Sequence, residues 1–172
     1  MDGYAIQAML QGDPHAEPVY KGVFAADTLP RRIEKYPAIL VANTDCSHLP
    51  GTHWVAMAID CHGRGIFFDS YGRSPTVPSH RQFMQRNCTT WKSSPARLQS
   101  IGTTVCGHYC VTFLLHWAHR FTLHNFLDFF TSDTEKNDRT VVELMKSYTR
   151  RGKKYCHDFP AVNQSCCALR KS

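Results

Sequence analysis

The chain has 172 residues, a hydrophobic share of 42% and a net charge of +6, which together suit one soluble globular domain over residues 1–172. No apolar run approaches the roughly 20 residues that a membrane-spanning helix needs, which excludes an integral membrane protein. The first residues lack a basic stretch followed by an apolar one, so we expect no secretion signal and a reducing intracellular location.

Eight cysteines are spread irregularly along the chain. Disulfide frameworks belong mainly to secreted proteins, so we expect none in a reducing compartment. Most of these residues are expected to be small buried side chains or unpaired thiols. They are Cys46, Cys61, Cys88, Cys106, Cys110, Cys156, Cys166 and Cys167.

The first part of the chain predicts a short helix, a loop and a buried strand. Residues 4–10 favour a helix that Gly12 and Pro14 would end. Residues 22–30 are typical of a loop. Residues 38–42 form a continuous apolar run of the length expected for a buried strand.

Two further runs, residues 53–59 and 65–70, are joined by a short polar stretch with a glycine, which predicts a β-hairpin. In an antiparallel pair, opposed residues have a constant index sum and project from one face of the sheet. If the turn is centred on residue 61, His53 and Asp69 face each other at the open end of the hairpin. The sequence sets this register to within a residue or two.

The second half of the chain predicts helices separated by short connections. Residues 78–87 favour a helix and residues 97–99 a short strand. From Cys106 to about residue 119, apolar residues recur at helical spacing, which indicates a helix packed on the core. Two more helices are expected over residues 123–130 and 139–150.

The excess positive charge lies in residues 139–172, which hold eight Lys or Arg and two Asp or Glu. Its densest part, residues 150–154, has the composition of a phosphate-binding cluster or of a nuclear localisation signal. Cations at a helix C-terminus also complement the helix dipole. Both interpretations stay open, and DNA binding through this basic segment is a secondary hypothesis.

Cys106 is placed to be a nucleophile. As the first residue of an apolar helix, it meets unpaired N–H groups and the positive end of the helix dipole, which favour the thiolate. His53 would take the thiol proton, and Asp69 would orient the imidazole, with Asp60 in the hairpin tip as the competing carboxylate. Acyl transfer also needs oxyanion donors, for which the backbone N–H of Cys106 and the side chain of Gln99 are candidates.

A structural zinc site is the alternative interpretation for several cysteines and histidines. No CxxC pair with metal-ligand spacing occurs, so we expect no metal. The side chains concerned are Cys106, Cys110, His108, His116, His119, Cys156, His157, Cys166 and Cys167.

Three motifs follow one another in a fixed order: His53-Trp54, then Phe-Asp-Ser-Tyr-Gly over residues 68–72, then Gln99 followed after six residues by Cys106-Gly107. Together they resemble the adenovirus protease (adenain) family, which belongs to the clan of the SUMO and ubiquitin-like-protein proteases. The resemblance covers about residues 20–120. Similar enzymes occur in double-stranded DNA viruses and in Maverick/Polinton transposons.

The resemblance implies an α+β fold with a central mixed sheet, flanking helices and the nucleophile at a helix N-terminus. It assigns Cys106 as the nucleophile, His53 as the base, Asp69 as the orienting acid and Gln99 as an oxyanion donor. Trp54 would flank the histidine and line a narrow substrate channel. Adenain has glutamate at the position matched by Asp69, whereas its SUMO-directed relatives have aspartate.

The implied activity is that of a cysteine endopeptidase that cuts viral or transposon structural precursors at glycine-containing sites during virion maturation, in the host nucleus and the virion. Adenain binds an activating peptide through a disulfide and uses DNA as a cofactor. By resemblance, Cys88 is a candidate site for such a peptide, and residues 139–172 for DNA. Two alternatives stay open: an isopeptidase that removes ubiquitin or SUMO, and a non-catalytic basic domain that binds nucleic acid.

Overall fold

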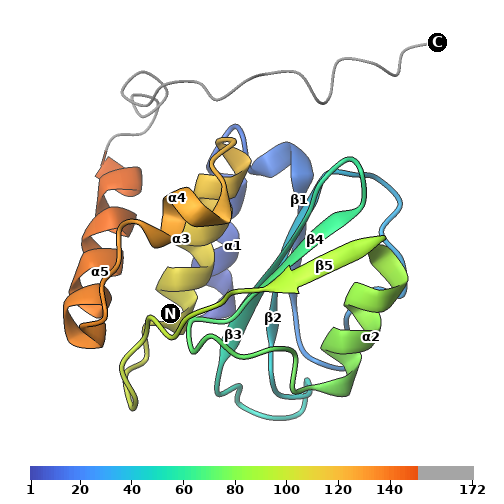
Figure 1. Cartoon of the computed structure of the whole chain (residues 1–172). Helices are drawn as coiled ribbons and strands as arrows, with labels where there is room; N and C mark the ends of the chain where they lie inside the picture. Colours follow the sequence, from blue (N-terminus) through green and yellow to red (C-terminus); the bar gives the residue numbers. More distant parts are fainter. Residues whose placement is uncertain (151–172) are drawn as a thin grey trace.

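The computed structural model describes residues 1–150, which form a five-stranded sheet with helices on both faces (Figure 1). In chain order the elements are α1 (Gly3–Gln11), the 3-10 turn η1 (Glu17–Val19), β1 (Tyr20–Phe24), β2 (Ala38–Asn43), β3 (Trp54–Ile59), β4 (Arg64–Phe68), α2 (Pro78–Asn87), β5 (Thr90–Ser93), α3 (Cys106–Ala118), α4 (Leu123–Leu127) and α5 (Thr134–Arg150). Within the described part of the chain, no helix combines the length and the apolar character needed to cross a membrane.

The sheet is mixed, and its strands lie side by side in chain order. β2, β3 and β4 are antiparallel neighbours, whereas β1 runs parallel to β2 and β5 parallel to β4. A parallel pair needs a crossover connection, and α2 supplies the one between β4 and β5. The predicted α+β class with a central mixed sheet and flanking helices is confirmed.

The two faces of the sheet are covered by different helices (Figure 1). α1, α3 and α4 lie on one face, with α5 packed against α3, and α2 lies on the other face. Along β3, Ala56 and Ala58 face α3, whereas Met57 and Ile59 face α2. The small alanine side chains let α3 pack closely on β3.

Aromatic packing anchors α3 to the hairpin. Phe113 of α3 stacks on Phe68 of β4 with ring centroids 4.6 Å apart, and Phe126 packs edge-on against both rings. All three side chains are buried, and burying a phenylalanine stabilises a fold by about 1.5–3 kcal/mol. This packing fixes the helix along the strands and thereby fixes Cys106 at its N-terminus.

Two predictions around the sheet edges are wrong. The predicted loop over residues 22–30 begins inside β1, an edge strand whose half-buried side chains form no continuous apolar run. The predicted strand over residues 97–99 does not form. The N–H groups of Leu98 and Gln99 both donate to one acceptor, the Ser70 carbonyl, whereas consecutive residues of a strand do not share an acceptor. The edge strand next to β4 is instead β5, which alternates between exposed and half-buried residues.

The helices agree with prediction at α1, α2 and α3 to within one or two residues, but the later limits differ. α4 ends at Leu127 instead of residue 130. α5 begins at Thr134 instead of residue 139, because the Asp133 side chain accepts the Lys136 N–H at 3.0 Å and caps an earlier first turn.

The hairpin register also differs from the prediction. Ala56 pairs with Phe68, so the turn is centred on residue 62 instead of residue 61. The Asp60 carboxylate accepts two backbone N–H groups of the tip at 2.9 Å each, which fixes this turn. Each residue therefore faces a partner two positions later than predicted, and this even shift keeps His53 and Asp69 on one face.

The turn after β4 depends on Gly72, whose φ is +68°. A Cβ there would lie 2.5 Å from the Ala96 carbonyl carbon, whereas Gly102, with φ of +82°, has open space around it. We expect Gly102→Ala to lower the free energy of unfolding by about 1–2 kcal/mol through backbone strain. Gly72→Ala is expected to lower it by more, because the backbone at residue 96 must also move. Urea denaturation measures both, and equal losses would contradict this packing.

Candidate active site

His53 and Asp69 lie at the same end of the β3–β4 hairpin. His53 immediately precedes β3, and Asp69 immediately follows β4. Both side chains are buried, and Nε2 of His53 lies 2.7 Å from Oδ1 of Asp69. The structure thus brings together the histidine and the carboxylate that the sequence singles out.

Further partners hold Asp69 in its ionised form. Nε of Arg73 donates to Oδ2 at 2.9 Å, and the backbone N–H of Tyr71 donates to Oδ1 at 2.9 Å. Burial would raise the pKa of Asp69, but its hydrogen bonds with His53 and Tyr71 and the nearby charges lower this pKa below its ordinary value of 3.8. Asp69 is therefore a carboxylate at neutral pH and can orient the imidazole.

Cys106 is the first residue of α3 and is 7% exposed. Within residues 1–150, no side chain caps this helix, and the backbone N–H groups of Trp54 and Gly107 act on the sulfur and favour its charged form. Burial would raise the pKa of Cys106, but the hydrogen bond with His53 and these two N–H groups lower it. The sulfur is stabilised as the thiolate, which is the nucleophilic form.

His53 connects the carboxylate to the sulfur. Since Nε2 is bound to Asp69, Nδ1 is the ring nitrogen left to contact Cys106. Burial would lower the pKa of His53, but its hydrogen bonds with Asp69 and Cys106 and their charges raise this pKa from 6.5 to about 9. The raised pKa of His53 and the lowered pKa of Cys106 both favour a thiolate–imidazolium pair, the form that nucleophilic cysteine chemistry uses.

Gln99 is fully buried in the segment that leads to α3, and both ends of its amide are bound. Oε1 accepts the Ser70 hydroxyl at 2.6 Å. Nε2 donates to the Thr103 carbonyl at 2.8 Å and to the Thr103 hydroxyl at 3.1 Å. Because Ser70 directly follows Asp69, the predicted oxyanion donor is tied to the strand end that carries the acid.

Trp54 lies beside the first turn of α3. Its indole N–H donates to the Met1 carbonyl at 3.1 Å, and its ring lies near Gly3 and Gly107. Figure 1 shows the N-terminus at the base of α3, close to the start of β3. Trp54 is therefore next to Cys106, and its role in substrate binding stays a prediction.

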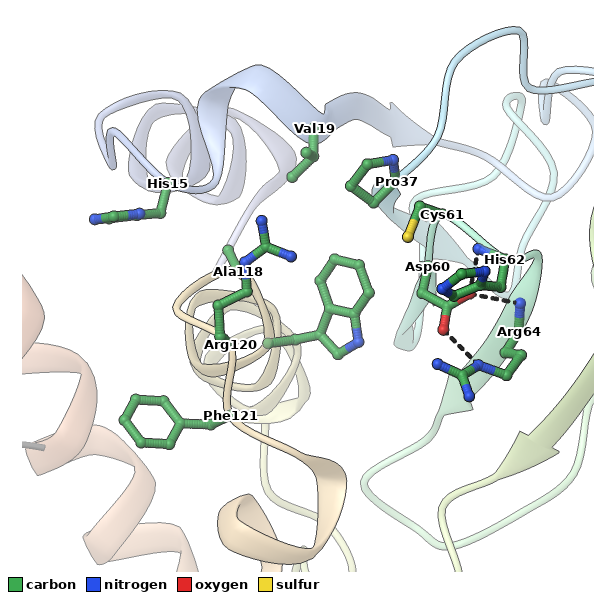
Figure 2. Close-up of a pocket in the computed structure, with 11 residues that line it drawn as sticks. His15, Val19, Pro37, Asp60, Cys61, His62, Arg64, Ala118, Arg120 and Phe121 are labelled. Carbon is green, nitrogen blue, oxygen red and sulfur yellow. Dashed lines mark hydrogen bonds and ion pairs between the residues drawn. The ribbon is translucent and has the colours of Figure 1, made fainter. Parts of the chain in front are cut away.

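Asp60, the competing carboxylate, lies at the other end of the hairpin. Its Oδ2 accepts Nε of Arg64 at 2.6 Å, and it lines a cavity of about 210 Å³ between the hairpin tip and the C-terminal end of α3 (Figure 2). The residues that line this cavity include none of the predicted catalytic residues. The length of the hairpin separates Asp60 from His53, so Asp69 is the carboxylate that binds the histidine.

Cys88 follows the last residue of α2, and its sulfur packs against Gly65 of β4. Burial, with a smaller contribution from the Asp60 charge, raises the pKa of Cys88 to about 11. The thiol is thus protonated at neutral pH, which slows thiol–disulfide exchange. Peptide binding through Cys88 stays a prediction.

Among residues 1–150, no group of three His, Cys, Asp or Glu side chains is arranged to hold a metal ion. Cys156, His157, Cys166 and Cys167, which belong to the alternative zinc site, lie outside the described residues. Most of the basic segment 139–172 also lies outside them, and its first residues form the end of α5. DNA binding through this segment stays a prediction.

Sequence reasoning missed two residues beside the histidine. The Tyr71 ring lies 4.9 Å from the His53 imidazole, and the Arg73 guanidinium lies 4.9 Å above the Tyr71 ring. One sequence feature could have indicated Arg73. It follows Asp69 by four residues across a turn that contains a glycine, and such a turn brings the two opposite charges together. Arg73 is thus the second cationic partner of the carboxylate.

The fold has counterparts among solved structures. The ASFV pS273R protease matches with a TM-score of 0.56 and 20% identity, over 81% of this chain and 65% of that one. ChlaDub1 from Chlamydia trachomatis matches with a TM-score of 0.49 and 16% identity, over 87% and 74% of the two chains. The Legionella pneumophila effector RavZ matches with a TM-score of 0.34 and 14% identity, over 75% and 46%. No protein-family model and no curated protein sequence matches the chain.

The likeness to the ASFV protease establishes the fold. The chain has the same α+β fold as that protease, and the α+β fold implied by the motif resemblance is confirmed. The chain spans 65% of the length of the ASFV protease.

The contacts of Cys106 predict how its reactivity depends on pH. Its rate of alkylation by iodoacetamide should rise with pH through an inflection below 9.0, the ordinary value for a thiol, because the thiolate is the reactive form. In His53→Ala the inflection should move upward, since a stabilising hydrogen bond and charge are lost. Mass spectrometry quantifies the modified peptide, with buried Cys110 as the unreactive control. The same inflection in both proteins would contradict the described contact.

Proposed function

We propose that the chain is a cysteine protease with Cys106 as its nucleophile. The observation that carries the proposal is the contact of three groups from separate parts of the chain: the Cys106 sulfur, the His53 imidazole and the Asp69 carboxylate. The fold shared with the ASFV pS273R protease supports it. A cysteine kept for packing alone needs neither a hydrogen-bonded histidine nor N–H donors around its sulfur.

In the first half-reaction, the Cys106 thiolate attacks the carbonyl carbon of the scissile peptide bond, and the carbonyl oxygen becomes an oxyanion. The His53 imidazolium gives its proton to the leaving amine as the C–N bond breaks. The products of this step are a thioester on Cys106 and a neutral His53. Asp69 holds the imidazole and stabilises its charged form.

In the second half-reaction, neutral His53 takes a proton from a water molecule, whose oxygen attacks the thioester carbon. The C–S bond then breaks, which releases the acid and restores the thiolate–imidazolium pair. The oxyanion is bound by the backbone N–H of Cys106 and by Gln99, one of whose N–H groups turns from the Thr103 hydroxyl to the substrate oxygen. Loss of one such donor typically raises the barrier by about 2.7–4 kcal/mol.

The proposed substrates are viral or transposon structural precursors, cut at glycine-containing sites in the host nucleus and the virion. The motif resemblance to adenain-type proteases supports this assignment. An isopeptidase for ubiquitin-like modifiers would use the same chemistry on a different substrate.

Substitutions test the proposed roles through kcat/KM on a fluorogenic peptide. Cys106→Ala should abolish hydrolysis, and His53→Ala should lower kcat/KM by about 10²–10⁴-fold, the usual contribution of general acid–base catalysis. Asp69→Asn should also lower it, because an amide does not stabilise the imidazolium. Asp60→Asn is the matched control and should keep wild-type kcat/KM, since Asp60 lies at the far end of the hairpin. Equal activity of Asp60→Asn and Asp69→Asn would contradict the proposed triad.

A second experiment tests the substrate class. Wild-type protein and Cys106→Ala are incubated with glycine-containing peptides and with propargyl derivatives of ubiquitin and SUMO, and the products are read by mass spectrometry. We expect peptide cleavage by the wild type alone and no adduct with either modifier. Adducts on Cys106 without peptide cleavage would assign ubiquitin-like modifiers as the substrates. No reaction with any probe would contradict protease activity.

A further inference from the structure

The segment from Leu98 to Val105, called here the oxyanion segment, carries Gln99 and leads into α3. Its outer part is exposed: Ile101 is 79% exposed, and a Cβ on Gly102 would meet nothing within 4 Å. Burial of apolar side chains therefore does not hold this part of the segment. Its geometry depends on hydrogen bonds, and α5 supplies several of them.

α5 binds the backbone of the oxyanion segment on both sides of Gln99. Asn137, which is 1% exposed, donates through Nδ2 to the Leu98 carbonyl at 3.2 Å. Asp138 accepts the Ser100 N–H at 3.3 Å. Because Leu98 and Ser100 are the two neighbours of Gln99, these contacts fix the backbone that presents the Gln99 side chain.

The same network reaches the helix of the nucleophile. Tyr109 is fully buried in α3, within one turn of Cys106. Its hydroxyl lies 3.0 Å from Oδ1 of Asp138 and 3.1 Å from the Leu98 carbonyl oxygen. Three elements that are separate in the sequence, α3, the oxyanion segment and α5, thus meet in one set of buried and half-buried hydrogen bonds.

We infer that Asn137 and Asp138 are positioning residues that hold Gln99 in place relative to Cys106. This inference rests on the proposed function and extends it to α5, a helix that contributes none of the proposed catalytic groups. Acyl transfer is sensitive to placement, and a displacement of about 1 Å can lower the rate by about 10²-fold. Loss of the Asp138 contact leaves the Ser100 N–H without its acceptor, and loss of the Asn137 contact leaves the Leu98 carbonyl with the Tyr109 hydroxyl alone. Both changes weaken the hold on the segment and favour such a displacement.

Two reactions of the same sulfur separate positioning from general damage. Alkylation by iodoacetamide needs the Cys106 thiolate and forms no oxyanion. Acylation by p-nitrophenyl acetate passes through a tetrahedral oxyanion and therefore depends on its donors. Mass spectrometry measures both products on Cys106, so the test does not require the natural substrate.

Asn137→Ala and Asp138→Ala should lower the acylation rate by about 10²-fold and leave the alkylation rate near the wild-type value. Asp138→Asn keeps one acceptor oxygen and should fall between Asp138→Ala and the wild type. Thr140→Ala is the matched control, because the Thr140 hydroxyl donates to the Lys136 carbonyl inside α5, and it should keep both rates. If circular dichroism shows that the alanine variants unfold, Tyr109→Phe replaces them, since it removes one hydroxyl and keeps the ring.

Wild-type acylation in folded Asn137→Ala and Asp138→Ala would overturn the inference and leave the proposed function intact. A parallel loss of acylation and alkylation would also overturn it, because such a loss indicates general damage to the site. Wild-type protein that is alkylated but never acylated on Cys106 would overturn the proposed function, and the inference with it.

Discussion

The contact between the Cys106 sulfur and the His53 imidazole joins two layers of the fold, since the histidine belongs to the sheet and the cysteine to the helix packed on it. Both groups are largely buried, and burial opposes charge on each of them. The charged pair is favoured because Asp69 stabilises the imidazolium while two backbone N–H groups stabilise the thiolate. The aromatic packing that fixes α3 against the hairpin therefore also sets the electrostatics of the site.

The turn after β4 contacts the proposed base, His53, and the proposed oxyanion donor, Gln99. Asp69 binds the histidine, and the next residue, Ser70, binds the amide of Gln99. Tyr71 covers the imidazole, and Arg73 returns to the carboxylate. A movement of this short turn would change the orientation of the imidazole and the placement of the amide together, so the proposed proton transfer and the proposed oxyanion binding depend on the same turn.

Local patterns in the sequence account for much of the fold and for the pairing of His53 with Asp69. Strand alternation places both residues on one face, and a register error of two positions leaves that result unchanged. β5 was not predicted because an edge strand with alternating half-buried residues lacks a continuous apolar run. Asn137 and Asp138 carry no local signal either, because polar residues on an amphipathic helix resemble a solvated face. Only tertiary packing buries Asn137 and brings Asp138 against the Ser100 N–H.

The protonation state of His53 tests the proposed ion pair most directly. In ¹⁵N-labelled protein, NMR titration of the imidazole should show the imidazolium through neutral pH and loss of its proton near pH 9, because the pKa is raised to about 9. In Cys106→Ala, the same titration should shift to lower pH, since the thiolate no longer stabilises the imidazolium. A His53 that titrates near its ordinary value of 6.5 in both proteins would contradict the ion pair and the catalytic role built on it.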